Sequence, residues 1–285
     1  MSRFTPKAAR ILVFGGPYSN LAALTAMRRR ALTLGIGAAQ TICTGDVVAY
    51  CAEPEETVAA IRDWGCLVIS GNCEEQLAAG ADDCGCGFAA DTACDRAAKD
   101  WYAYARTRIS AASRSWMANL PGHLDFTYGG RRVRVVHGGV TRVNRFVFAS
   151  EPDAIAEELA ATDADLVIAG HSGLPFIAKS ASRLWFNPGV IGMPANDGTP
   201  DGWYGLITHD GTDVVLSTHR LAYDYAAAQR TTASAGHADG YARALSNGLW
   251  PSLDVLPQAE RAATGIALSE VHWRQTRWSV ESSSV

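Results

Sequence analysis

Four polar side chains in this sequence each follow a short apolar run and stand beside a glycine: Asp46, Asn72, His137 and His171. We call these four residues the quartet. A carboxylate, an amide oxygen and two imidazoles suit a divalent transition metal such as Mn²⁺, Fe²⁺ or Zn²⁺. Taken singly, Gly-Asp and Gly-Asn are ordinary turn dipeptides, and a histidine after a strand is most often a hydrogen-bonded core or rim residue. Because the same arrangement recurs four times, the pattern favours one shared metal site.

The elements that must position the quartet begin with an alternation of strand and helix. The predicted elements are a strand over 10–14, a helix over 21–31, a strand over 40–44, a helix over 53–64 and a strand over 66–70. This succession is typical of a buried parallel sheet, in an α/β fold, and the ligands of such sheets gather beyond the carboxyl ends of the strands. Asp46 and Asn72 each follow such a strand end.

The rest of the chain is helical at first and then rich in strands. Residues 73–120 read as helices, in which four aromatics are expected to pack in a core: Trp101, Tyr102, Tyr104 and Trp116. Further strands are predicted over 124–127, 133–136, 165–169, 183–187, 202–209 and 214–221, with hairpin turns at Gly129-Gly130 and Asp210-Gly211. From 226 onward the pattern is helical and then irregular and serine-rich. No linker divides the chain, so we expect a single domain over 1–285.

Composition and charge exclude several classes of protein. The 285 residues are 48% hydrophobic, which supports a sizeable core rather than disorder. The formal charge of −4 gives no general attraction to nucleic acid or to a membrane surface, so we expect neither as a partner. No apolar run approaches the roughly 20 residues that span a bilayer. The seven cysteines lie in the first third and, with no secretory signal, indicate reduced thiols in the cytoplasm.

Six ordered motifs carry a resemblance to a known family. They are Gly16-Pro17-Tyr18-Ser19-Asn20, Gly45-Asp46, Gly71-Asn72-Cys73-Glu74, His137-Gly138, Gly170-His171-Ser172-Gly173-Leu174-Pro175 and Asn187-Pro188-Gly189-Val190-Ile191-Gly192. In this order they resemble the calcineurin-like metallophosphoesterases, within them the small bacterial branch of phosphodiesterase-like and diadenosine-tetraphosphatase-like proteins. The resemblance covers about 10–250. It implies a four-layer α/β/β/α sandwich with metals at one edge, a helical flap over about 73–120 and a C-terminal helical extension over about 226–285.

The resemblance also implies two metal sites, of which one is depleted here. The family's first metal takes the positions occupied in this chain by Gly16, Tyr18, Asp46 and Gly173. Three of these cannot serve, because glycine has no side chain and a neutral tyrosine is a poor ligand. The second metal takes the positions of the quartet, which is whole. Loss confined to one site indicates that the other is used, so we expect one divalent ion per chain.

Three further positions are candidates for catalysis by the same resemblance. Cys73 stands where the family has a general-acid histidine or a cysteine, and Glu74 stands where an aspartate steadies it. A thiol is a weaker proton donor than an imidazolium. Tyr18, at a lost ligand position, either offers its hydroxyl to a substrate oxygen or fills the emptied metal pocket.

A group of cysteines follows the third motif, at Cys84, Cys86 and Cys94. With Cys73 they could hold a structural zinc or form a redox pair. Yet Cys-x-Cys is not the usual zinc spacing, so thiols that shape the flap are the simpler interpretation.

Two classes of function fit these observations. We expect a hydrolase, dependent on one metal, of a small phosphoester or a related phosphorylated compound. The alternative is a non-catalytic member of the fold that binds a ligand or a partner, and a weaker third is redox chemistry at a lone iron. The sequence leaves the substrate, the metal and a homo-oligomeric state open.

Overall fold

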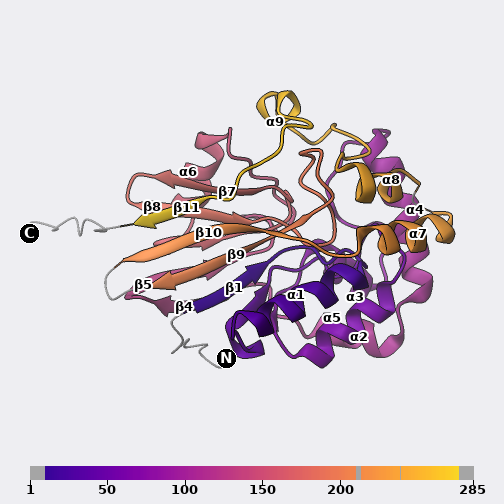
Figure 1. The fold of residues 1–285 in the computed structure, drawn as a ribbon, viewed down its shortest axis with the longest axis horizontal. Coiled ribbons are helices and arrows are strands. Elements are labelled where there is room, and N and C mark those ends of the chain that lie inside the picture. Colours follow the sequence, from indigo (N-terminus) through magenta and orange to yellow (C-terminus); the bar gives the residue numbers. More distant parts are fainter. Residues whose placement is uncertain (1–9, 210–212, 238, 276–285) are drawn as a thin grey trace, which may run out of the picture.

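The computed structural model describes residues 10–209, 213–237 and 239–275, and within them two mixed sheets lie face to face (Figure 1). The larger sheet has the order β11–β10–β9–β1–β2–β3. Its strands are β1 Arg10–Phe14, β2 Thr41–Cys43, β3 Leu67–Val68, β9 Gly202–His209, β10 Val214–Leu221 and β11 His272–Gln275. Strands β1, β2 and β3 are parallel, as predicted, whereas β9 is antiparallel to β1.

The smaller sheet has the order β4–β5–β6–β8–β7. Its strands are β4 Leu124–Tyr128, β5 Arg131–Val135, β6 Leu166–Ile168, β7 Pro175–Ser180 and β8 Arg183–Pro188. Strands β5, β6 and β8 are parallel to one another. Past its last residue, β8 meets the other sheet, because Gly15 N–H donates to the Gly189 carbonyl at 3.0 Å and Ile191 N–H donates to the Gly15 carbonyl at 3.1 Å. The two parallel halves are therefore joined at the edge where their strands end.

The central strands are buried on both faces, and this produces the layers. In β1, Ile11 and Val13 pack into the core between the sheets, while Leu12 and Phe14 pack against helices. On the other side, α6 (Pro152–Ala160) covers the smaller sheet by placing Ile155 against a separate apolar cluster. Three cores thus separate four layers, which confirms the predicted α/β/β/α sandwich.

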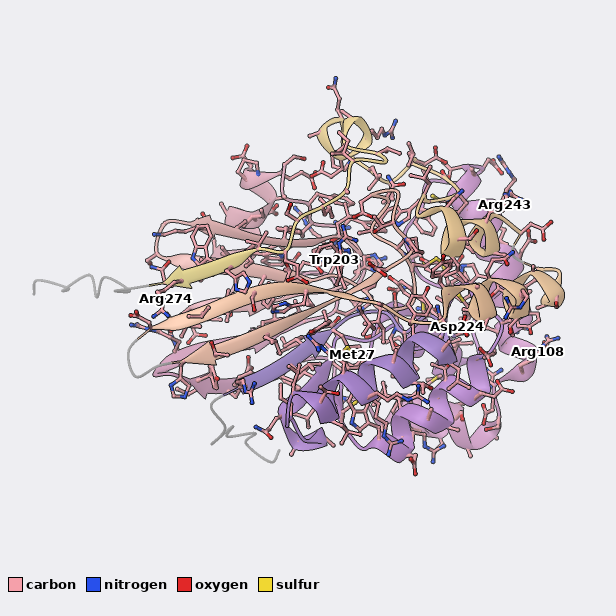
Figure 2. All side chains as sticks on the ribbon, viewed as in Figure 1. Met27, Arg108, Trp203, Asp224, Arg243 and Arg274 are labelled. Atoms are coloured by element: carbon pink, nitrogen blue, oxygen red, sulfur yellow. The ribbon has the colours of Figure 1, made fainter. Side chains whose placement is uncertain are left out.

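Helices cover the larger sheet and one end of the molecule (Figure 1). They are α1 Leu21–Thr33, α2 Pro54–Trp64, α3 Asn72–Ala79, α4 Ala93–Arg108, α5 Ala111–Ala118, α7 Tyr225–Ala235 and α8 Asp239–Asn247, with a 3₁₀ turn at Ala38–Gln40. The short α9, Gln258–Ala262, lies apart from them, where Glu260 accepts hydrogen bonds from Ser150. Asn20 begins α1 by accepting the Ala23 N–H at 3.0 Å, and Gly65 ends α2 in a left-handed conformation. Figure 2 shows Met27 and Trp203 directed into the interior and Arg108 and Arg243 at the surface.

The helical reading of 73–120 corresponds to α3, α4 and α5, with an irregular segment over 80–92 between α3 and α4. Trp101 and Tyr102 are buried in the core, as predicted, and Trp116 packs against it. The predicted hairpin turn at Asp210-Gly211 lies outside the described residues. Among the described residues, no helix is both long enough and apolar enough to cross a membrane.

Three elements escaped the sequence prediction: α6, β7 and β11. The prediction of an irregular tail was wrong at β11, which pairs with β10 so that Trp273 lies opposite Leu216. Its four residues, His272–Gln275, lack an alternating apolar pattern of their own. The neighbouring strand supplies the hydrogen bonds that hold this segment extended, and a local pattern cannot report that contact.

Candidate metal centre

The quartet comes together at the joined edge of the two sheets. Asp46 follows β2, and Asn72 is the first residue of α3, directly after the loop that leaves β3. His137 follows β5, and His171 follows β6. The four preceding strands, β2, β3, β5 and β6, lie in the parallel halves of the sheets, so their carboxyl ends meet at the joined edge. Each member of the quartet is more than nine-tenths buried.

The ligand atoms of the quartet lie within a few ångströms of one another. His137 Nε2 is 3.1 Å from Asn72 Oδ1, 3.1 Å from His171 Nδ1 and 3.3 Å from the Asp46 carboxylate. That carboxylate is 4.0 Å from His171 Nδ1. Two donors bound to one zinc-like ion at about 2.05 Å in a tetrahedron lie about 3.3 Å apart. The spacing therefore fits a single ion.

The hydrogen bonds behind the quartet fix which atoms face inward. His137 Nδ1 donates to the Thr44 carbonyl at 2.7 Å, so that Nε2 presents a lone pair to the centre. Asn72 Nδ2 donates to the Cys84 carbonyl at 2.9 Å, so its oxygen also faces inward. His137 Nε2, Asn72 Oδ1 and the Asp46 carboxylate are therefore all hydrogen-bond acceptors that face one another. Such a set repels itself unless a cation lies at its centre, and the residues present therefore fit a divalent metal.

The electrostatics agree with this assignment. Burial and the neighbouring His137 lower the pKa of His171 to about 3, which keeps its ring neutral and able to ligate. Burial opposes the ionisation of Asp46, but the interaction with His137 outweighs burial and lowers the pKa of Asp46. The same carboxylate raises the pKa of His137 against the effect of burial, so that a metal at the centre takes the place of a proton on that ring. An ionised carboxylate and a neutral imidazole are the states that a metal requires.

The glycines of the second and third motifs allow the loops to approach this closely. A Cβ at Gly45 would lie 2.7 Å from the Gly71 nitrogen and 3.0 Å from His137 Nδ1. A Cβ at Gly71 would lie 2.5 Å from Asp46 Oδ1. The two backbones thus pass directly beneath the His137 ring, where no side chain fits. Asp46 and His171 themselves adopt positive φ angles of 53° and 57°, a strained conformation often found at functional sites.

Glu74 lies behind Asp46 and holds its loop. The Glu74 carboxylate accepts the backbone N–H groups of Asp46 at 2.8 Å, Val47 at 2.9 Å and Gly71 at 2.9 Å. Its side chain is fully buried, and burial with the nearby Asp46 charge raises its pKa to about 7. Both oxygens accept backbone N–H groups, so this predicted catalytic residue holds the loop that carries Asp46 in place.

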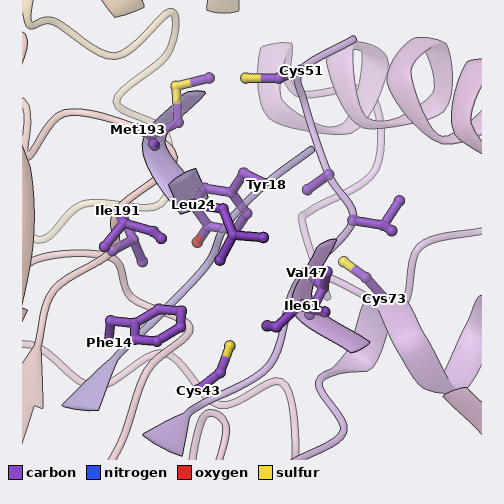
Figure 3. Close-up of a cluster of buried hydrophobic side chains, with 14 of the residues drawn as sticks. Phe14, Tyr18, Leu24, Cys43, Val47, Cys51, Ile61, Cys73, Ile191 and Met193 are labelled. Atoms are coloured by element: carbon purple, nitrogen blue, oxygen red, sulfur yellow. The ribbon is translucent and has the colours of Figure 1, made fainter. Parts of the chain in front are cut away.

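Aromatic rings lie beside Gly16 and Gly173, the two glycines at the predicted positions of the first metal. A Cβ added to Gly16 would overlap the Tyr18 ring, which is 4% exposed. Figure 3 shows this ring between Leu24 and Ile191 in the core. At Gly173, a Cβ would lie 3.3 Å from Trp250 Cζ2, so that a larger side chain would enter the indole. Tyr18 and Trp250 therefore occupy the space beside both glycines.

The thiols gather around the amide of Asn72. Its Nδ2 lies 3.5 Å from Cys73 Sγ and 3.4 Å from Cys86 Sγ, and the Cys86 N–H is 3.4 Å from Cys84 Sγ. All three cysteines are buried, and burial raises the pKa of Cys73 well above its ordinary value. Within the described ranges, the side chains close enough together to hold one ion belong to Asp46, His137 and His171, without the thiols.

Sequence reasoning missed two contributors to this centre. Thr44 acts through its backbone carbonyl, which no residue type reveals. Trp250 comes from the C-terminal segment, about 80 residues beyond the last motif it touches, and only the fold brings it beside Gly173. The sequence signal that could have indicated a filling group is the pair of glycines at lost ligand positions.

Comparison with known proteins gives the same family. The model of the calcineurin-like phosphoesterase superfamily domain matches residues 23–237. An uncharacterized protein of Methanocaldococcus jannaschii, MJ0912, is 24% identical over 239 residues, which are 75% of this chain and 88% of that protein.

Two solved structures share the fold. The metallophosphoesterase from Sphaerobacter thermophilus has a TM-score of 0.65 and 22% identity, and the match covers 85% of this chain and 100% of that one. The hypothetical protein PH1004 from Pyrococcus horikoshii OT3 has a TM-score of 0.71 and 17% identity, covering 85% and 99%.

Replacing Glu74 with alanine should destabilise the protein by about 3 kcal/mol, because several buried backbone N–H groups lose their acceptor. Urea unfolding of the metal-free protein measures this change. The adjacent Glu75 is exposed, so Glu75→Ala is the matched control and should change stability by less than about 0.5 kcal/mol. Equal effects of the two changes would contradict the positioning arrangement.

Replacing His171 with alanine should lower metal affinity by more than about a hundredfold, since loss of groups that merely support a ligand already costs roughly 10- to 100-fold. Metal content after dialysis against a buffered metal series measures the affinity. His219 stacks on Tyr204 at 5.3 Å and lies away from the quartet, so His219→Ala should retain the metal. The same metal content in both variants would refute the ligand assignment.

Proposed function

Because the chain belongs to the calcineurin-like phosphoesterase superfamily, we propose that it hydrolyses a small phosphoester with one divalent ion held by the quartet. The observation that carries this proposal is the convergence of the quartet's acceptor atoms. Tyr18 and Trp250 lie beside the two glycines at the predicted positions of the first metal, which supports a single ion. A divalent ion supplies Lewis acidity, which polarises a phosphoryl oxygen and makes a water more acidic.

The chain's own groups set the conditions for this reaction. The hydrogen bond to the Thr44 carbonyl holds the His137 ring in one tautomer. Glu74 fixes the loop of Asp46, and the buried position of the quartet excludes bulk water from most of its surface. In hydrolysis the water oxygen forms a bond to phosphorus, the bond from phosphorus to the ester oxygen breaks, and a proton passes from the water to the departing oxygen.

A binding protein without turnover is the second candidate. It is favoured by Cys73, which stands at the family's general-acid position but is buried, with its thiol beside the Asn72 amide. The two candidates differ in a single measurement, because both retain the metal and only the first releases product.

Purified protein should contain one divalent ion per chain, and with added Mn²⁺ it should hydrolyse bis(p-nitrophenyl) phosphate. Elemental analysis gives the stoichiometry, and absorbance of p-nitrophenolate gives the rate. Two ions per chain would contradict a site that holds a single metal. One ion without turnover of any phosphoester would select the binding protein.

The rate should depend steeply on the acidity of the leaving alcohol, because burial raises the pKa of the Cys73 thiol and backbone N–H groups occupy the Glu74 carboxylate, so that both are poor proton donors to a leaving group. A tenfold change in rate corresponds to about 1.4 kcal/mol in the barrier. A series of aryl phosphodiesters measures the slope. Cys73→His should flatten the slope if the new imidazole reaches the leaving oxygen. Cys66 directly precedes β3, at the end of that strand far from the quartet, so Cys66→Ser should leave the slope unaltered. A wild-type rate that is insensitive to the leaving group would contradict this account.

A further inference from the structure

A cavity of about 130 Å³ opens beside the quartet and shares His171 with it. The residues that line it come from the ends of strands, from α4 and from the C-terminal segment. They include the aromatic residues Tyr18, Tyr50, Phe88, Phe146, Tyr241 and Trp250. The lining residues include no aspartate, glutamate, lysine or arginine. The cavity therefore offers no partner to a phosphate and suits an uncharged group.

The aromatic walls are held in fixed orientations. Tyr50 stacks on Tyr241 with ring centroids 4.4 Å apart and meets Tyr18 edge-on at 4.7 Å. Phe146 lies against the His171 ring, with centroids 4.2 Å apart. Faces and edges of several rings thus surround one space, an arrangement that favours a flat ligand in stacked or edge-to-face contact.

The C-terminal wall is a built structure. Trp250 Nε1 donates to the Pro194 carbonyl at 2.7 Å, and the Trp250 N–H donates to Asn196 Oδ1 at 2.9 Å. Gly248 turns the chain into this position with φ 75°, where a Cβ would collide with the backbone of Thr199. The opposite wall is tied to the same segment, because the Ala93 N–H donates to the Asp254 carboxylate at 3.0 Å.

The size of the cavity limits the ligand. An engineered protein cavity of about 150 Å³ lined by apolar side chains binds benzene. A space of about 130 Å³ therefore accepts one six-membered ring but not two fused rings without movement of a wall. His171 lies both in the quartet and in the cavity wall, so a ring in the cavity is adjacent to a group bound at the quartet.

We propose that this cavity holds the single uncharged ring of an aryl phosphoester whose phosphoryl group lies at the quartet. The substrate class rests on the proposed function, whereas the ring site itself does not. Hydrolysis of such an ester transfers the phosphoryl group to water and releases a phenol.

The first experiment measures binding without turnover. In calorimetry of the manganese-loaded protein, phenylphosphonate should bind at least tenfold more tightly than methylphosphonate, and 1-naphthylphosphonate should gain no such advantage. Phenol, which has no phosphoryl group, should bind saturably with the metal removed by chelation. Equal affinities for phenyl- and methylphosphonate, or no saturable binding of phenol, would overturn the proposal.

Substitutions test the location of the ring. Ala97 lines the cavity from α4, and Ala97→Leu should fill it and abolish the advantage of the phenyl group. Val255→Ala, at another lining residue, should enlarge the cavity and improve binding of the naphthyl compound, which keeps the test decisive if Ala97→Leu fails to fold. Tyr225→Ala is the control, because Tyr225 is exposed on α7 outside the cavity, and it should leave the phenyl preference intact. Unchanged preferences in both cavity variants would refute the site.

The outcomes separate the two proposals. Phenol binding that responds to these substitutions, in a protein that hydrolyses no phosphoester, would support the ring site and reject the proposed function. Hydrolysis without any preference for a single ring would support the function and reject the ring site.

Discussion

Two carboxylates buried side by side impose the main electrostatic constraint on this protein. The negative charge of Asp46 raises the pKa of Glu74, which shows that the two carboxylates repel each other. Among the described residues, neither carboxylate forms an ion pair with lysine or arginine. Glu74 is compensated by backbone N–H groups, which leaves Asp46 with two imidazoles. A buried charge without compensation is strongly unfavourable. The glycines, the strained φ angles and the inward lone pairs of the quartet all become consistent once a cation completes this charge balance.

The sequence predicted the centre of this arrangement better than its surroundings. Asp46 and Asn72 could be placed together because consecutive parallel strands end at one edge, and that rule depends only on order along the chain. The apolar strands such as 10–14 indicated a buried sheet, whereas the packing of two sheets was implied by the family resemblance. Trp250 could not be predicted, because no local pattern states which distant segment fills the space beside Gly173. The role of Glu74 was likewise hidden, since its partners are backbone groups rather than side chains.

The aromatic rings beside Gly16 and Gly173 limit what this edge of the sheets can hold. Ligand side chains surround a small charged object, whereas Tyr18 and Trp250 present flat apolar surfaces. The same loops that carry the family motifs therefore support two adjoining environments, one of inward lone pairs and one of ring faces. His171 belongs to both, with Nδ1 toward Asp46 and its ring against Phe146. His171 thus borders both the quartet and the aromatic cavity.

The late position of Trp250 in the chain has a consequence for biosynthesis. All members of the quartet, and the strands before them, are synthesised before Trp250 emerges from the ribosome. Until that residue reaches the Pro194 carbonyl, the space beside Gly173 has no indole in it. Docking of the C-terminal segment therefore adds the last aromatic wall of the cavity after every member of the quartet has been synthesised.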